Sequence, residues 1–190
     1  MTERALPRVV LLDRDGVLNE DRTDYVKSVA EWVWLPGARE AVARLHAAGI
    51  RVAVLTNQSC VNKGIVALET LEAVHRRMHG EAETAGGRIS AVFHCPHVDA
   101  DACDCRKPLP GMIHQAAAHF GVDAREIPFV GDAGRDLEAA AAAGARPVLV
   151  RTGKGRDTEQ GALPPGTLVF DDLPAYTEAL LDSSREEPAC

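Results

Sequence analysis

The chain has 190 residues, of which 46% are hydrophobic and 26% charged, and its formal net charge is −7. This composition is ordinary for a globular protein, and we expect residues 1–190 to form a single domain. The acidic balance argues against nonspecific binding to nucleic acid, which needs a basic surface. No apolar stretch approaches the roughly 20 residues of a membrane span. The first residues leave no room for a signal peptide, so we expect a cytoplasmic protein. We also expect it to be a monomer.

Short apolar runs typical of strands alternate along the chain with segments whose apolar residues recur at helical spacing. This alternation predicts an α/β fold of three layers, Rossmann-like, in which helices cover both faces of a parallel sheet. We expect a surface loop over 153–166 and a frayed tail over 183–190. The segments after Gly16 and Gln58 are too short for a large lid, which predicts a capless domain. In chain order the predicted strands are 8–12, 51–55, 90–94, 127–130, 146–150 and 167–170, and the predicted helices are 37–48, 66–84, 110–120, 134–143 and 174–182.

Two aspartates directly follow the first predicted strand. Asp13 and Asp15 are two residues apart, so extended backbone places them on one side, and Gly16 comes next. Carboxylates this close repel each other unless a cation or a shared proton relieves them. We therefore predict a Mg²⁺ site at which Asp13 is a nucleophile toward phosphorus and Asp15 a general acid and base. The alternative is a pair of turn carboxylates that cap backbone amides.

Polar residues also follow the second predicted strand. In an open parallel sheet, ligands bind beyond the carboxyl ends of the strands, and Thr56-Asn57-Gln58-Ser59 falls at such an end. The hydroxyl of Thr56 and nearby backbone amides can grip phosphate oxygens. An N-cap of the following helix explains the same residues equally well. The amide of Asn57 can orient the substrate.

Two basic residues and two further aspartates complete the predicted phosphate site. Lys107 supplies a fixed positive charge that offsets charge developing on phosphoryl oxygens, and Arg106 can bind a second anionic group of the substrate. A solvated basic pair is the alternative. Asp132 is the further predicted Mg²⁺ ligand. Asp136 lies on the same helical face, four residues later, and either orients the site or favours the helix N-terminus.

Three cysteines and one histidine lie within a stretch of 11 residues, at Cys95, His97, Cys103 and Cys105. This ligand set suits tetrahedral Zn²⁺, and because it fills all four positions it predicts a structural site. The zinc would pin a loop, residues 95–108, that has no core of its own. Chance cysteines or a disulfide are the alternative, which a reducing compartment disfavours.

Taken together, these motifs resemble the haloacid dehalogenase (HAD) superfamily. More narrowly, they are similar to its capless, zinc-containing D,D-heptose 1,7-bisphosphate phosphatases, with the histidinol-phosphate phosphatases as close relatives. The resemblance covers roughly residues 8–152. The motifs that carry it are Asp13-Arg14-Asp15-Gly16, Thr56-Asn57-Gln58-Ser59, Cys-Pro-His at 95–97, Cys-Asp-Cys-Arg-Lys-Pro at 103–108, and Gly131-Asp132.

The resemblance implies a Mg²⁺-dependent phosphatase that forms an aspartyl phosphate and removes the C7 phosphate of a heptose 1,7-bisphosphate. Histidinol phosphate is the alternative substrate, and a noncatalytic, zinc-stabilised binding module is the alternative from another class. Lys63 stands where the family usually has arginine. The resemblance implies that Asp13, the backbone carbonyl of Asp15, and Asp132 bind Mg²⁺. It implies that Zn²⁺ is bound by Cys95, His97, Cys103 and Cys105, and that Thr56 and Lys107 stabilise the phosphate. The residues implied to lie against the substrate are Asn57, Gln58, Ser59, Lys63 and Arg106.

Overall fold

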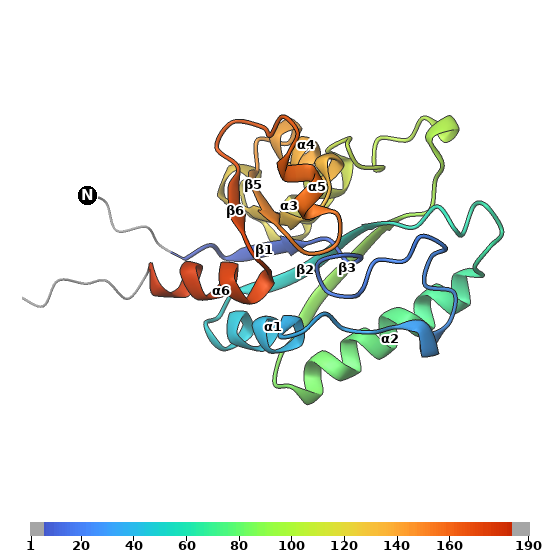
Figure 1. Cartoon of the computed structure of the whole chain (residues 1–190), viewed down its shortest axis with the longest axis horizontal. Helices are drawn as coiled ribbons and strands as arrows, with labels where there is room; N and C mark the ends of the chain where they lie inside the picture. The colour runs from blue at the N-terminus through green and yellow to red at the C-terminus, as the bar shows by residue number, and fades with distance from the viewer. Residues whose placement is uncertain (1–5, 184–190) are drawn as a thin grey trace, which may run out of the picture.

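The computed structural model describes residues 6–183. Its centre is a six-stranded parallel sheet with the strand order β3-β2-β1-β4-β5-β6 (Figure 1). The strands are β1 (Val9–Leu12), β2 (Arg51–Asn57), β3 (Ile89–Cys95), β4 (Pro128–Gly131), β5 (Arg146–Val150) and β6 (Leu168–Phe170). The α-helices are α1 (Ala38–Ala47), α2 (Leu68–Thr84), α3 (Gly111–Phe120), α4 (Gly134–Ala142), α5 (Gly155–Glu159) and α6 (Leu173–Asp182), with short 3-10 helices at Val29–Glu31, Asp99–Asp101 and Ala124–Glu126.

The predicted α/β fold with a parallel sheet is confirmed, and two local predictions need correction. The second strand continues to Asn57 because it keeps pairing with β3 as far as Cys95, so Thr56 belongs to the strand and does not follow it. The predicted surface loop 153–166 contains the helix α5, whose five residues are too few to show a helical repeat in sequence. Apart from Ser183, which ends α6, the predicted tail 183–190 lies outside the described residues.

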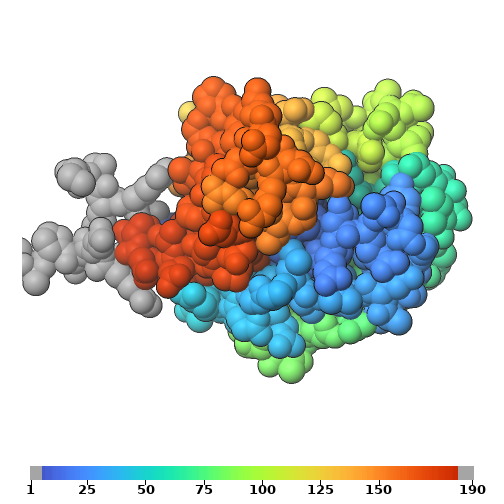
Figure 2. Space-filling model, viewed as in Figure 1, coloured from blue at the N-terminus to red at the C-terminus, as the bar shows by residue number. Residues whose placement is uncertain are grey.

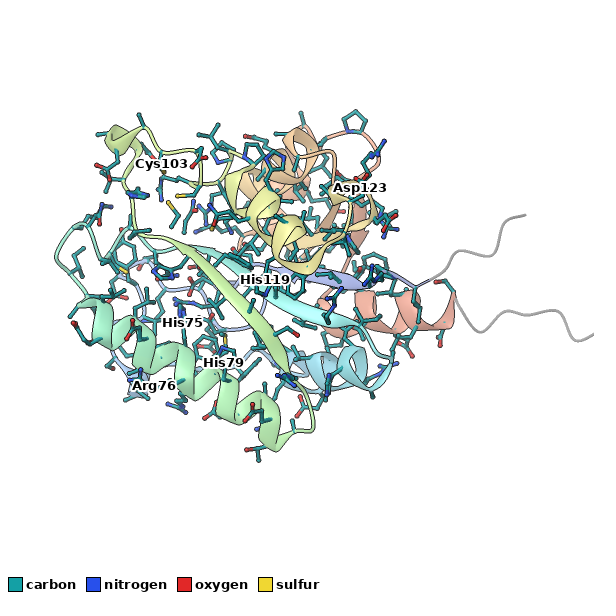
Figure 3. The ribbon with its side chains drawn as sticks, turned by 180° about the vertical axis from the view of Figure 1, so that it is seen from behind. His75, Arg76, His79, Cys103, His119 and Asp123 are labelled. Atoms are coloured by element: carbon teal, nitrogen blue, oxygen red, sulfur yellow. The ribbon has the colours of Figure 1, made fainter. Side chains whose placement is uncertain are left out.

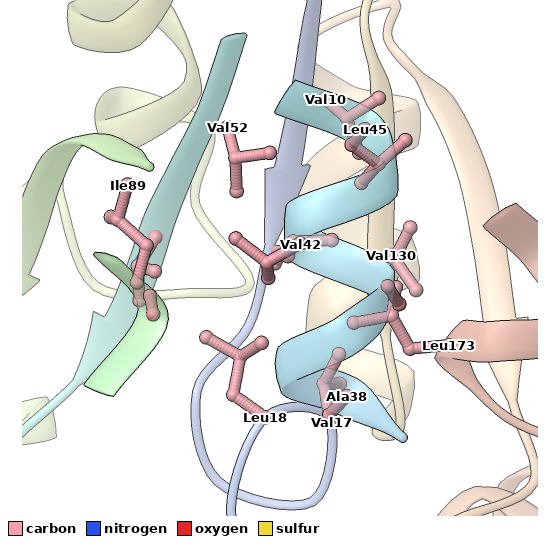
Figure 4. Packing of buried hydrophobic residues seen from close by; sticks show 14 of the residues in the cluster. Val10, Val17, Leu18, Ala38, Val42, Leu45, Val52, Ile89, Val130 and Leu173 are labelled. Atoms are coloured by element: carbon pink, nitrogen blue, oxygen red, sulfur yellow. The ribbon is translucent and has the colours of Figure 1, made fainter. Parts of the chain in front are cut away.

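Alternation along β1 supplies two hydrophobic cores, one on each side of the sheet. Val10 and Leu12 pack in a cluster with residues of α1, α2 and α6. Figure 4 shows this cluster, with Val42 and Leu45 of α1 lying against the sheet. The alternate positions of β1, together with Ala53 and Leu55 of β2, pack against α3 and α4. The sheet is therefore buried on both faces, and its functional side chains gather at one edge.

The segment between β1 and α1 is held down by aromatic packing. Its described residues form one short 3-10 helix, Val29–Glu31, and no α-helix. Trp32 is almost fully buried and meets Trp34 edge to face at 5.4 Å between ring centroids. The indole of Trp34 donates a hydrogen bond of 2.7 Å to Glu81 Oε2 on α2. Between residues 6 and 183, none of the helices combines the length and apolarity that crossing a membrane requires.

Candidate active site

Three carboxylates and one lysine form a buried charged cluster at the carboxyl edge of the sheet. Asp13 follows β1, Asp132 follows β4, and Asp136 lies in the first turn of α4. Oxygens of the three carboxylates all lie within 4.8 Å of one another. Each of these residues is at most 2% exposed, as is Lys107. The structure thus brings together the sequence-predicted residues Asp13, Lys107 and Asp132, and adds Asp136 to them.

Lys107 is the cation of this cluster. Its Nζ lies 2.8 Å from Asp13 Oδ1 and 2.8 Å from Asp136 Oδ1, and it donates a hydrogen bond of 2.9 Å to the carbonyl of Leu55. Burial alone would lower the pKa of Lys107, but the two carboxylates outweigh it and raise that pKa. The side chain of Asn57 holds the main chain of Lys107 with two hydrogen bonds, of 3.0 and 3.1 Å. The amide of Asn57, which also lines the cleft, therefore positions the lysine.

The cluster carries more negative charge than Lys107 can balance. Burial, reinforced by the charge of Asp136, raises the pKa of Asp13 to about 6. Burial, with the charges of Asp13 and Asp136, raises the pKa of Asp132 to about 8. Within the described residues, Asp132 Oδ1 is buried without a hydrogen-bond partner. Unpaired carboxylate oxygens in an electron-rich pocket are the ligands that Mg²⁺ prefers, so the residues present fit this ion.

The segment after β5 wraps around Asp132. The backbone amide of Lys154 donates a hydrogen bond of 2.8 Å to Asp132 Oδ2, and the hydroxyl of Thr158 donates one of 2.9 Å to the Asp132 carbonyl. Gly153 has a φ of +54°, and a Cβ there would lie 2.1 Å from Asp132 Oδ2. Thr152 reaches across to donate a hydrogen bond of 2.6 Å to the carbonyl of Gly16. In Figure 2 this segment, in orange, lies beside the blue segment that follows β1.

Asp15 is not part of the carboxylate cluster and instead accepts hydrogen bonds from three side chains. Arg14 Nη2 donates to Asp15 Oδ1 at 2.8 Å, Asn19 Nδ2 to the same oxygen at 2.9 Å, and Gln58 Nε2 to Oδ2 at 2.8 Å. Burial would raise the pKa of Asp15, yet the charge of Arg14 and these hydrogen bonds hold that pKa below its ordinary value. Gln58 Nε2 also donates to Thr56 Oγ1, at 2.8 Å. Asp15 is therefore held as a carboxylate at the mouth of the site.

A cleft of about 260 Å³ opens beside Asp15, and its lining holds six basic side chains against two acidic ones. Lys63 donates a hydrogen bond of 2.8 Å to the hydroxyl of Tyr25. Arg106 is held by Asp99 and by the carbonyl of His97. Thr56 lies below the cleft surface, 1% exposed. The lining residues are Arg14, Asp15, Asp21, Arg22, Thr23, Tyr25, Asn57, Gln58, Ser59, Lys63, Arg106, Arg135 and Lys154.

Sequence reasoning gave no site role to four of the cations that line the cleft: Arg14, Arg22, Arg135 and Lys154. Arg22 lies in the irregular segment after β1, where no spacing rule places a side chain. Arg135 lies three residues after Asp132, and Lys154 lies four residues after the end of β5. For Arg135 and Lys154, the available signal was their position shortly after the carboxyl end of a parallel strand.

The four predicted zinc ligands meet at one point outside the cleft. Distances between sulfur atoms of Cys95, Cys103 and Cys105 are 3.2 to 3.7 Å. His97 Nδ1 lies 3.5 Å from the sulfur of Cys95 and 3.4 Å from that of Cys105. Three sulfurs and one nitrogen gathered this closely fit tetrahedral Zn²⁺ with no open position. The cluster fixes the loop that delivers Arg106 and Lys107.

The fold and the site together define a HAD-like hydrolase. The family model described as HAD-hydrolase-like matches residues 104–176. The D-glycero-beta-D-manno-heptose-1,7-bisphosphate 7-phosphatase of Pseudomonas aeruginosa is 51% identical over 173 residues, which are 91% of this chain and 97% of that protein. The chain therefore belongs to the D-glycero-beta-D-manno-heptose-1,7-bisphosphate 7-phosphatase family, and the resemblance seen in its motifs is confirmed.

Two solved structures have the same fold. The D,D-heptose 1,7-bisphosphate phosphatase of Bordetella bronchiseptica, complexed with magnesium and phosphate, superimposes with a TM-score of 0.90 at 49% identity and covers 92% of this chain and 98% of its own. The enzyme of the same name from Burkholderia thailandensis gives a TM-score of 0.73 at 44% identity, with coverage of 92% and 98%. Magnesium in the first of these structures agrees with the carboxylate cluster that fits Mg²⁺ here.

Proposed function

We propose that the protein is a Mg²⁺-dependent phosphatase that removes the C7 phosphate of D-glycero-D-manno-heptose 1,7-bisphosphate. One observation carries this proposal: the Asp13 carboxylate lies beside the Lys107 ammonium, in a cluster that fits Mg²⁺, next to a cationic cleft. The identity to heptose bisphosphatases over nine tenths of the chain supports the choice of sugar. We further propose that it works as a monomer in the cytoplasm, where a reducing environment keeps the zinc-binding thiols available.

In the first half of the reaction, an Asp13 oxygen attacks phosphorus and forms an acyl phosphate, while the bond from phosphorus to the ester oxygen breaks. Asp15 is a carboxylate in the free site, so it takes up a proton as the anionic substrate binds beside it and gives that proton to the departing sugar oxygen. Lys107 offsets the negative charge on the phosphoryl oxygens. Thr56 accepts its hydrogen bond from Gln58, which leaves its own hydroxyl hydrogen to be donated to the phosphoryl group.

In the second half, water attacks the phosphorus of the aspartyl phosphate. Asp15, now a carboxylate, takes a proton from this water, and the bond between phosphorus and the Asp13 oxygen breaks to release inorganic phosphate. Mg²⁺, held by Asp13, the carbonyl of Asp15, and Asp132, would supply positive charge that screens the nucleophile from an anionic substrate. Asp136 holds Lys107 and accepts a hydrogen bond from the Ala133 amide, so it keeps the cation in place.

The cationic cleft suits a substrate with two phosphates. One phosphate lies over Asp13 for hydrolysis, and the other needs positive charge some distance away. Arg106 and Lys63 line the cleft and are not part of the buried cluster. We propose that they bind the second phosphate, with Ser59 and Gln58 against the sugar. Arg106 is well suited to this role because its guanidinium forms paired hydrogen bonds with phosphate oxygens.

The test is phosphate release from a panel of esters, measured with and without Mg²⁺ in protein that retains its zinc. We expect Mg²⁺-dependent release from heptose 1,7-bisphosphate, with a much lower kcat/KM for histidinol phosphate and for heptose monophosphates. A preference for histidinol phosphate would overturn the substrate. No release from any ester, with zinc still stabilising the fold, would overturn the enzyme in favour of a zinc-stabilised binding module.

A further inference from the structure

Arg14 is a buried cation to which the reaction scheme gives no part. It stands between Asp13 and Asp15 in sequence, and it is 1% exposed. A buried guanidinium is stable only when its donors are paired. The partners of Arg14 come from three segments of the chain: Asp15 beside it, Trp32 after the 3-10 helix, and His75 on α2. Its carbon Cζ lies 5.9 Å from the centre of the Trp32 ring.

The contact between Arg14 and His75 fixes the state of the imidazole. Arg14 Nη1 lies 3.3 Å from His75 Nε2. A guanidinium has only donors, so Nε2 must accept and the remaining ring hydrogen must sit on Nδ1. Burial, together with the charge of Arg14, lowers the pKa of His75 to about 3, in agreement with a neutral ring. His75 therefore acts as a neutral acceptor that holds one end of the guanidinium.

The other end of the guanidinium holds Asp15. Arg14 Nη2 and Nε lie 2.8 and 3.3 Å from Asp15 Oδ1. The imidazole of His75 thus fixes the orientation of the Arg14 guanidinium, and this guanidinium fixes the orientation of the Asp15 carboxylate. Figure 3 shows His75 and His79 along the side of α2 that faces the sheet, with Arg76 on the outer side. His75 and Arg14 are 61 residues apart in sequence, and their contact links α2 to the acid/base residue.

We propose that His75 and Arg14 are positioning residues, which hold the carboxylate of Asp15 in the orientation from which it protonates the departing oxygen. This inference rests on the proposed function, since it gives Asp15 the role of general acid. A purely structural role of His75 predicts that its loss affects all substrates equally. A positioning role predicts a loss that depends on how much the leaving group needs a proton.

The test compares kcat/KM for two esters in His75→Leu and His75→Gln. This ratio reports the steps up to formation of the aspartyl phosphate, before Asp15 is needed as a base. Heptose 1,7-bisphosphate releases an alkoxide that must be protonated, whereas p-nitrophenyl phosphate releases a stable phenolate. In His75→Leu we expect kcat/KM for the sugar to fall by about 10- to 100-fold, part of what a general acid contributes, and that for the aryl ester by less than about threefold. His75→Gln, whose amide oxygen can accept from Arg14, should recover most of the loss.

The matched control is His79→Leu, the same substitution one turn further along α2, where the side chain is half-buried. Its kcat/KM should match wild type for both esters. Equal losses of His75→Leu on the two esters, or no loss on either, would overturn the inference. If His75→Leu does not fold, Arg14→Lys, which keeps the charge without the fork, must show the same dependence on the leaving group. Wild type that hydrolyses only other alkyl phosphates would overturn the proposed substrate, and the comparison is then made with those esters.

Discussion

The backbone amide of Lys154 donates a hydrogen bond of 2.8 Å to one carboxylate oxygen of Asp132. This contact uses Oδ2 and leaves Oδ1 buried without a partner in the described chain. A carboxylate held by one oxygen and open at the other is oriented for a metal ion. The segment 152–155, which is far from the Asp13 motif in sequence, therefore sets the orientation of the Asp132 carboxylate.

Substituting Gly153 with alanine should weaken binding of Mg²⁺. The new Cβ would lie 2.1 Å from Asp132 Oδ2, so the carboxylate must shift. Changes in groups that orient a metal ligand cost about 10- to 100-fold in affinity. Calorimetric titration with Mg²⁺ should show a dissociation constant raised by about this factor.

The control for that variant is Gly166→Ala. Gly166 also has a positive φ, of +80°, but a Cβ there would meet no atom within 4 Å. Both variants therefore carry backbone strain, and only Gly153→Ala displaces the carboxylate. Similar Mg²⁺ affinity in the two variants would show that the segment after β5 does not orient Asp132.

In Mg²⁺-free buffer, the fold should lose stability as the pH rises. Burial and the neighbouring carboxylates raise the pKa of Asp132 from an ordinary 3.8 to about 8. Between these values the folded protein binds more protons than the unfolded chain, so the free energy of unfolding falls with rising pH. We expect the melting temperature to fall from about pH 5 to about pH 8, which thermal scans at a series of pH values will measure.

Asp132→Asn is the comparison for this pH dependence, because the amide does not titrate. Its melting temperature in Mg²⁺-free buffer should fall less steeply than that of wild type over the same range. Saturating Mg²⁺ should flatten the wild-type curve, since the ion stabilises the charged carboxylates. Parallel curves for the variant and wild type would contradict a raised pKa at Asp132.

Local patterns in the sequence were enough to predict the sheet and the ends of its strands. A buried apolar run that stops at Asp13, and another that stops at Gly131-Asp132, mark the edge where ligands bind in this fold class. The four zinc ligands are also local in sequence, because all lie within residues 95–105. Features of this kind depend on spacing, which a sequence displays directly.

The contacts that the sequence did not reveal join segments far apart in the chain. Arg14 meets His75 across 61 residues, and Lys154 meets Asp132 across 22. No periodicity marks either pair, since each depends on how α2 and the segment after β5 dock on the sheet. Asp136 was ambiguous for a related reason: its spacing fits a helix N-terminus, and only the folded chain places it 2.8 Å from Lys107.

Replacing Cys103 with serine should lower zinc content and stability together. A structural zinc site contributes folding free energy, and three remaining ligands bind the ion more weakly than four. We expect loss of most of the zinc by elemental analysis and a melting temperature lower by roughly 10 °C. Cys60→Ser is the control, because Cys60 is buried outside the zinc cluster and its loss should leave zinc content intact. Full zinc occupancy in Cys103→Ser would refute the structural role of the site.

Replacing Lys107 with methionine should damage both the fold and the reaction. Methionine has a similar length but no charge, so Asp13 and Asp136 would lose the ammonium that lies 2.8 Å from each. Breaking a buried ion pair costs about 3–5 kcal/mol, and loss of a group that stabilises developing charge costs about 10²–10³ in kcat. Chemical denaturation will measure the loss of stability, and phosphate release will measure the loss of kcat.

Lys27→Met is the control, since Lys27 pairs with Asp24 in a solvent-exposed salt bridge of small free energy. Because Mg²⁺ adds positive charge to the same carboxylates, saturating Mg²⁺ should restore part of the stability of Lys107→Met and little of its kcat. Recovery of kcat as well would mean that the ammonium serves the fold and not the phosphoryl group.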